Sequence, residues 1–205
     1  MKNPAALLLP NRSLWTAAVL ACLLALPAGA ARAQPVRYAI DPEHLSVGFL
    51  VDHIGYAKVL GMFRAARGSY SFDEASGNLA EVRIEIDTQS VFSNHTKRDQ
   101  HLKSADFLNA SEFPRMVFTA SNARRTGERS FEITGQLELL GRSQPLTLQA
   151  TWNKSGPSPI AKTYVMGVSA RGSFKRSAYG MNYGVGNGWV GDDVALIVEF
   201  EAIRQ

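Results

Sequence analysis

Four histidines are the first residues to consider for chemistry in this 205-residue chain. Imidazole binds metal ions and exchanges protons near neutral pH. His44 and His53 lie nine residues apart in a segment that reads as a strand, and an odd separation places them on opposite faces. His95 and His101 are six residues apart across a predicted helix start, which is a poor spacing for a shared ion. We therefore predict structural or pH-sensitive histidines, no metal site and no cofactor.

Nucleophilic catalysis finds no support in the sequence. The chain has no G-x-S-x-G motif, and no local arrangement of serine, histidine and aspartate stands out. The glycine-rich stretch GVGNG at 184–188 does not lie between a strand and a helix, so a hairpin loop fits it better than a phosphate-binding loop. We predict no catalytic residue and no enzymatic activity. A hydrolase that uses His44 or His101 is the less favoured alternative.

Residues 94–114 (NHTKRDQHLKSADFLNASEFP) interrupt a chain that otherwise reads as strands. Thr96 and Asp99 match a capping box, with Thr96 as the N-cap of a short helix. Asp99 and Lys103, four residues apart, can form an ion pair on its exposed side. The pattern predicts a short helical connector near 96–109 whose apolar side rests on the open end of the domain.

The first 33 residues have the parts of a secretory signal. A positively charged start precedes an apolar run at 14–26, and an A-x-A cleavage site ends at Ala33. We predict Sec-type export, cleavage after Ala33 and a periplasmic mature chain, 34–205, that forms one domain. The signal carries three basic residues and no acid, so its removal lowers the net charge from +4 to about +1. Charge therefore gives no reason to expect a nucleic-acid partner.

Apolar and polar residues alternate with a period of two along most of the mature chain. This period is typical of antiparallel strands with one face in water. Turn-forming residues separate the segments, and about eight strands in one domain predict an all-β barrel or sandwich. The alternating segments are 46–53, 57–63, 82–87, 131–139, 145–152, 164–174 and 194–203.

Two features favour the barrel. The segment 57–72 reads as one long strand that can bend or bulge at Gly68. Small residues also interrupt the apolar face, and these allow either a tightly packed core or an open lumen. They are Gly61, Gly135, Ala150 and Ala170.

Successive segments over 36–203 resemble the signatures of the YceI-like family of periplasmic proteins, in that family's order and spacing. They are YAIDPEHLSVGFLVDHIGYAKVLGMF, KRDQHLKSADFLNASEFPRMVF, GQLELLGRSQPLTL and KRSAYGMNYG with VGDDVALIVEFEA. The resemblance implies an extended, lipocalin-like antiparallel β-barrel that holds a polyisoprenoid or similar amphiphile in its lumen. Leu45, Leu108 and the SAYGM stretch at 177–181 depart from the family's usual pattern. We expect these changes to affect the end of the lumen and not the fold.

Two sets of side chains follow from the predicted barrel and this resemblance. We expect inward-facing residues to line the lumen and contact the ligand, namely Val47, Phe49, Val51, Val59, Phe63, Phe118, Leu137, Trp152, Met166, Val168 and Phe174. We expect a polar rim to meet the ligand's head group, namely His44, Arg98, Asp99, His101 and Arg176. In the alternative, Arg98 and Arg176 tie the connector and the last strands to the barrel end. Both roles can hold together.

The expected function is binding and sequestration or transport of a polyisoprenoid, such as an isoprenoid quinone or its precursor. The alternative is a stress-related barrel that binds another small amphiphile, a fatty acid or amide, or none. The partner is then a lipid and not nucleic acid, with transient contact to a membrane. A monomer and a homodimer are both compatible with the sequence.

Overall fold

The computed structural model describes residues 35–205, so the predicted signal at 1–33 lies outside the described residues. Strands make up most of this region, with one short α-helix and two 3₁₀ turns. The strands are β1 (Val36–His53), β2 (Ala57–Phe63), β3 (Ala66–Phe72), β4 (Leu79–Asp87), β5 (Val91–Phe92), β6 (Arg115–Ala120), β7 (Arg124–Arg125), β8 (Ser130–Leu139), β9 (Arg142–Pro157), β10 (Tyr164–Lys175) and β11 (Val190–Arg204). The helix is α1 (Thr96–Lys103), and the 3₁₀ turns are η2 (Thr88–Ser90) and η3 (Arg176–Tyr179).

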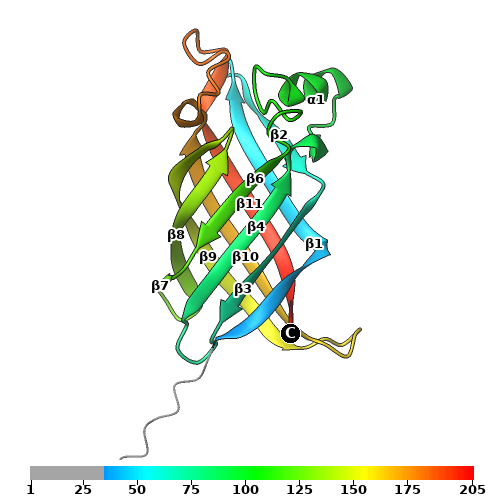
Figure 1. Cartoon of the computed structure of the whole chain (residues 1–205), viewed down its shortest axis with the longest axis vertical. Helices are drawn as coiled ribbons and strands as arrows, with labels where there is room; N and C mark the ends of the chain where they lie inside the picture. Colours follow the sequence, from blue (N-terminus) through cyan, green and yellow to red (C-terminus); the bar gives the residue numbers. More distant parts are fainter. Residues whose placement is uncertain (1–34) are drawn as a thin grey trace, which may run out of the picture. The chain divides into compact units, whose positions relative to one another are not determined.

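Eight strands form a closed antiparallel ring in the order β1-β3-β4-β6-β8-β9-β10-β11, and β11 returns to pair with β1 (Figure 1). β1 is the longest strand and has two partners on its other edge. Its first part pairs with β3, as in Tyr38 opposite Tyr70, and its last part pairs with β2, as in Val51 opposite Val59. The prediction of an all-β barrel of about eight strands is confirmed.

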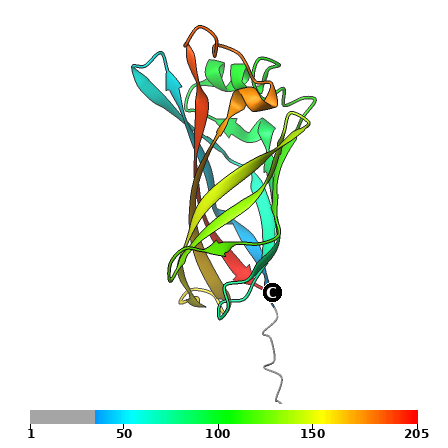
Figure 2. The ribbon, with the colours of Figure 1, turned by 90° about the vertical axis from the view of Figure 1, so that its left-hand side faces the viewer.

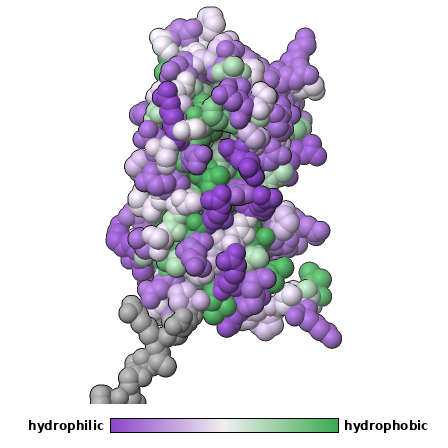
Figure 3. Space-filling view, viewed as in Figure 1, coloured by the Kyte–Doolittle hydropathy of each residue, from purple (hydrophilic) through white to green (hydrophobic). Residues whose placement is uncertain are grey.

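Alternation along each strand separates an apolar interior from a polar exterior. On β8, Phe131, Leu137 and Leu139 are buried, whereas Glu138 between the last two is exposed. Because successive side chains of a strand point to opposite faces, this pattern repeats around the ring. The barrel wall is accordingly mostly hydrophilic in the view of Figure 3.

The segment 57–72 is two strands, so the prediction of one long strand bent at Gly68 is wrong. The break lies at Arg64 and Ala65, whose backbone N–H groups donate to the carbonyl and the hydroxyl of Ser90 at 3.1 and 3.0 Å. β2 thereby leaves the ring to pair with β5. Gly68 instead permits close packing, since a Cβ there would lie 2.7 Å from the carbonyl oxygen of Arg83 on β4.

The predicted helical connector exists as α1, shorter than the predicted 96–109, followed by tight turns up to β6. It lies at one end of the barrel, which is the upper end in Figure 1. Within 35–205, no helix has the length and apolar character needed to cross a bilayer.

Candidate ligand-binding cavity

The barrel encloses a cavity of about 430 Å³ whose walls are almost entirely apolar. This volume lies within the range of about 300–1,000 Å³ that is typical of small-molecule sites. All the side chains predicted for the lumen, from Val47 on β1 to Phe174 on β10, line this cavity. The structure therefore brings them together around one space, and their contact with a ligand stays a prediction.

The small residues of the inner face serve two different purposes. Ala150 and Ala170 are register partners on β9 and β10, and both line the cavity. Gly61 instead accommodates the ring of Phe49, because a Cβ at this glycine would lie 2.2 Å from a ring carbon. Gly135 makes room in the same way for Phe118, at 2.7 Å. The alanines widen the lumen, whereas the glycines allow aromatic side chains to pack in the wall.

Polar atoms are few in the deep half of the cavity, far from α1. The hydroxyl of Tyr70 donates to the sulfur of Met166 at 3.4 Å. Trp152 packs edge-on against Phe72, with ring centroids 5.9 Å apart. Its indole nitrogen is buried without a hydrogen-bond partner among residues 35–205. Because this nitrogen has almost no accessible surface, it is packed within the wall and is not exposed to the lumen.

A polar network crosses the lower end of the barrel, beyond the cavity lining. Glu74, in the turn after β3, accepts hydrogen bonds from the hydroxyls of Tyr38 (2.7 Å), Ser155 (2.7 Å) and Tyr164 (3.1 Å). Burial, and then the bond to Glu74, raise the pKa of Tyr38 above its usual value. Residues 74–78 (EASGN) have the composition of a turn, and nothing in their local sequence indicates that three strands converge on Glu74.

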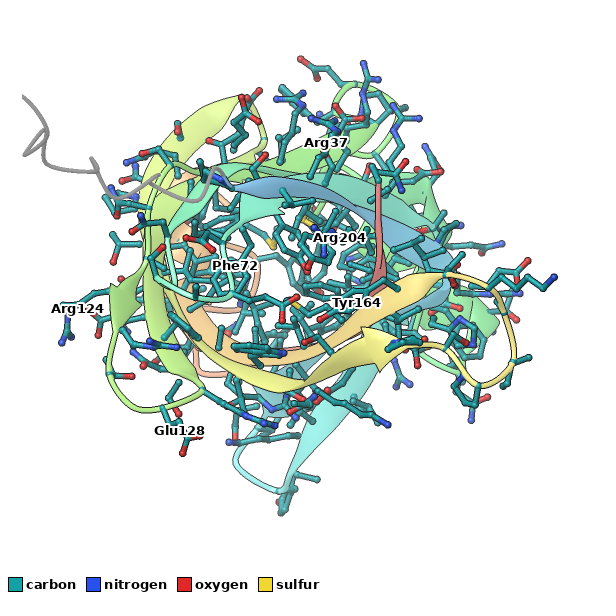
Figure 4. The ribbon with its side chains drawn as sticks, turned by 90° about the horizontal axis from the view of Figure 1, so that it is seen from below. Arg37, Phe72, Arg124, Glu128, Tyr164 and Arg204 are labelled. Atoms are coloured by element: carbon teal, nitrogen blue, oxygen red, sulfur yellow. The ribbon has the colours of Figure 1, made fainter. Side chains whose placement is uncertain are left out.

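The guanidinium of Arg204 lies over the aromatic ring of Tyr164, 5.4 Å from the ring centroid, in a cation–π contact. Figure 4 looks at this end from below and shows Arg204 within the ring of strands, whereas Arg124 and Glu128 lie outside it. This end is thus held together by side chains from both sides of the barrel.

The cavity reaches the surface at the opposite end, which we call the mouth. Exposed residues Ile54, Tyr183 and Trp189 belong to its lining there. Figure 2 shows α1, the β1–β2 hairpin and the loop before β11 at this same end. The charged side chains and the histidines of the lining all come from these elements and from η3: Asp52, His53, Arg98, His101 and Arg176.

Arg176 is the most buried charged residue described, with 1% of its surface exposed. Its guanidinium donates to the carbonyl oxygens of Met181 (2.9 Å), Tyr183 (2.7 Å), Val190 (2.8 Å) and Gly191 (2.7 Å). Burial lowers the pKa of Arg176 despite the nearby negative charge of an aspartate. These bonds hold the loop that forms one side of the mouth. The contacts of Arg176 thus match the alternative in which this arginine ties the last strands to the barrel end.

Arg98 and Asp99 fasten the start of α1 to Ser93. Arg98 donates from Nε to the hydroxyl of Ser93 (2.8 Å) and from Nη2 to its carbonyl (2.6 Å). Asp99 accepts from the backbone N–H (2.7 Å) and the hydroxyl (2.5 Å) of the same serine. The predicted ion pair of Asp99 with Lys103 is therefore wrong, because the carboxylate turns toward β5. Asp99 lies outside the main cavity lining, whereas Arg98 belongs to it.

The N-cap of α1 is His95, so the prediction of Thr96 is wrong. The Nδ1 atom of His95 accepts a hydrogen bond from the backbone N–H of Arg98 at 3.3 Å. An imidazole nitrogen satisfies the orphan donor here in the way that a hydroxyl oxygen usually does.

His101 lies at the mouth among aromatic rings. Its ring meets those of Phe107 and Tyr183 edge-on, at centroid distances of 4.9 and 4.8 Å. Its Nε2 atom is 2.8 Å from a carboxylate oxygen of Asp106. The aromatic rings and Asp106 thus fix the orientation of the imidazole at the edge of the cavity.

His44 is not part of the mouth, and its prediction as a rim residue is wrong. It lies exposed on the outer wall, where its Nδ1 atom is 2.7 Å from Asp41, and that hydrogen bond raises the pKa of His44. The pairing of β1 with β11 shifts register between Ile40 and Leu45, so the residues around His44 bulge out of the ladder. His53, at the mouth end of the same strand, lines the cavity and was missed.

Comparison with known proteins gives one consistent relationship. The family model described as YceI-like domain matches residues 38–202. A UPF0312 protein from Azotobacter vinelandii is 36% identical over 179 residues, which is 86% of this chain and 92% of that protein. The crystal structure of the Campylobacter jejuni YceI protein is 27% identical, with a TM-score of 0.68 over 75% of this chain and 90% of that one. A polyisoprenoid binding domain from Saccharophagus degradans shares the fold at 13% identity, with a TM-score of 0.63 over 83% of this chain and 99% of that domain.

Proposed function

Because the chain belongs to the YceI-like family, we propose that its barrel binds a polyisoprenoid or a similar amphiphilic lipid, such as an isoprenoid quinone or its precursor. We further propose that it sequesters or transports this lipid in the periplasm, after removal of residues 1–33. The observation that carries the proposal is the apolar cavity of about 430 Å³, in a fold shared with a polyisoprenoid binding domain. The role is binding without chemical turnover.

Burial of the lipid's hydrocarbon chain supplies the driving force. Removing a methylene from water contributes about 0.8 kcal/mol, so each five-carbon unit contributes roughly 3–4 kcal/mol before ordering costs. A few units approach the ceiling of about −20 kcal/mol for non-covalent binding. Since a membrane solvates the same chain equally well, exchange with membranes governs how the barrel is loaded.

The distribution of charge sets the orientation of the lipid. The charged lining side chains lie at the mouth, and the deep walls are formed by residues such as Tyr70, Phe72 and Met166. An ionised or strongly polar head group is costly to bury without partners. The head group therefore lies at the mouth near Arg98 and His101, and the hydrocarbon chain extends toward the Glu74 network.

Two departures from the family's usual pattern fall on the cavity. Leu108 is buried and lines it, and so does Met181, the last residue of the SAYGM stretch. Leu45 is half-buried in β1 and lies outside the lining. We therefore expect Leu108 and Met181, in the mouth half of the cavity, to distinguish the ligand preference of this chain from that of other family members.

Organic extraction of the purified protein tests the proposal. The protein is isolated from the periplasmic fraction, where its intact mass is expected to match a chain that begins at Gln34. Mass spectrometry of the extract is expected to show an isoprenoid lipid at about one molecule per barrel. The delipidated protein is then titrated with a polyprenol, a quinone and a fatty amide. Uptake of the fatty amide alone supports the alternative ligand class, and uptake of none of the three contradicts a lipid-binding function.

A further inference from the structure

Large exposed apolar side chains gather at the mouth. We call Ile54, Tyr56, Leu60, Tyr183 and Trp189 the apolar collar, whose exposed fractions are 47%, 89%, 62%, 39% and 55%. They come from the β1–β2 hairpin and from the loop before β11, which project together at the mouth end in Figure 2. At the far end of the barrel, the loop between β9 and β10 exposes a single such residue, Ile160. The two ends of the barrel therefore differ in how many large apolar side chains they expose.

The collar is continuous with the cavity. Ile54, Tyr183 and Trp189 belong both to the collar and to the cavity lining. The backbone N–H of Ile54 donates to the carbonyl of Trp189 at 3.2 Å, which joins the hairpin tip to the loop. Whatever covers the collar therefore also covers the opening through which a ligand enters.

The hairpin tip holds its apolar residue in an unfavourable backbone conformation. Ile54 and Gly55 have φ angles of 55° and 71°, and the N–H of Tyr56 donates to the carbonyl of His53 at 3.1 Å. Such a turn favours Asn and Gly, and a β-branched residue is a steric outlier in it. Leu140 has a similar φ of 53° but packs against the core, whereas Ile54 is exposed, so the position of Ile54 is compatible with a role outside the fold itself.

The composition of the two tips fits a lipid bilayer. Residues 54–57 (IGYA) and 182–190 (NYGVGNGWV) contain no charged side chain, and Lys58, exposed between Tyr56 and Leu60, is the one charged residue among the collar positions of the hairpin. Tyrosine and tryptophan are enriched where an apolar region meets water, because their rings are apolar and their tips can hydrogen-bond. A stable protein interface instead takes about 20–30 residues from each partner. The two tips together supply fewer residues than such an interface needs. Insertion between lipid head groups therefore fits them better.

We propose that the apolar collar inserts into the surface of a lipid bilayer and places the mouth against it. The amphiphile then passes between membrane and cavity without crossing water. The passage of lipid rests on the proposed function, whereas the attachment to the bilayer stands on the collar alone. Because the tips are uncharged and Lys58 is a single cation beside them, attachment depends mainly on apolar insertion and changes little with salt.

Flotation of the purified protein with phosphatidylcholine vesicles tests the attachment. The double variant Y56S/L60S removes two collar side chains that do not line the cavity. We expect it to lower the fraction of protein that floats with vesicles by roughly tenfold, at low and high salt alike. The matched control is I160S, which removes the exposed apolar residue at the far end and is expected to float like the unaltered protein.

Two further measurements separate this proposal from others. The rate of polyprenol transfer between vesicles is expected to fall in Y56S/L60S, while the amount of polyprenol bound per barrel at equilibrium stays unchanged. Equal flotation of Y56S/L60S and the unaltered protein overturns the proposal. A change from dimer to monomer in Y56S/L60S without vesicles also overturns it, in favour of a second copy. Collar-dependent flotation of a protein that takes up no lipid refutes the proposed function and leaves the attachment standing.

Discussion

Arg176 and His44 illustrate how residues of the same predicted set have different environments. Arg176 directs its guanidinium to backbone carbonyls of the mouth loop and has 1% of its surface exposed. His44 lies on the outer wall with Asp41. Both are polar residues next to strand ends or bulges, but only the arginine shapes the opening of the cavity.

We expect Arg176→Met to lower the free energy of unfolding by about 3 kcal/mol or more, because several buried carbonyl oxygens lose their donor. Arg176→Lys is expected to lose less, since an ammonium group retains part of the donors. Denaturant unfolding measures both. Arg171→Lys, at an exposed pair with Glu199, is the control and is expected to cost less than about 1 kcal/mol. Equal losses at the two positions would contradict the role assigned to Arg176.

The strands and turns at the lower end are joined by Glu74. This side chain connects the β3–β4 turn to β1, β9 and β10 through hydroxyl donors. Backbone pairing closes the ring, but only side chains such as this one link strands across it. The network therefore sets the shape of the end at which the cavity stops.

Glu74→Gln is expected to lower the free energy of unfolding by about 1–3 kcal/mol, because hydrogen bonds to a carboxylate are stronger than those to an amide. A double-mutant cycle with Tyr164→Phe measures how much of this loss belongs to their shared bond, and a coupling of about 0.5 kcal/mol or more is expected. Thermal or denaturant unfolding of the four proteins gives the values. Purely additive losses would show that the network does not act as a unit.

At the scale of the whole molecule, the protein is a hollow barrel with two different ends. The ring of strands supplies the wall, the Glu74 network crosses the lower end, and the mouth opens beside α1 and the apolar collar. Because the two ends of the barrel differ, the size of the bore and the side chains at the mouth can vary independently. Under the proposed function, the bore sets how much lipid is held, and the mouth sets how the lipid enters.

Ala170→Phe is expected to fill part of the bore and lower the amount of polyprenol bound at saturation by at least half. The new ring enters existing space, so the free energy of unfolding is expected to change by less than about 1.5 kcal/mol. Quantitative extraction and denaturant unfolding provide the two readouts. Thr151→Phe places the same ring on the outer face of β9 and is the control. Undiminished binding by Ala170→Phe would show that the lipid does not occupy this part of the cavity.

The barrel wall could be predicted from the sequence because alternation is a local property. A strand turns successive side chains to opposite faces, so the inward direction of most residues between Val47 and Phe174 follows from spacing, whereas the family resemblance implied that they line a lumen. The helical connector was also predicted, although His95 caps it in place of Thr96. Errors appeared where pairing between distant segments overrides local pattern, as at the break between β2 and β3 and at the bulge that carries His44 outward.

The sequence by itself determined which side chains face inward, and with them the apolar character of the bore. Only the tertiary structure decided that the alanines leave space while the glycines receive aromatic rings, that Glu74 links strands across one end, and that the collar surrounds the other. The physical reason is that inward or outward direction depends on a residue's neighbours in the chain. The size of the cavity and the meeting of several strands at Glu74 depend instead on segments far apart in sequence. These segments come together only when the ring closes.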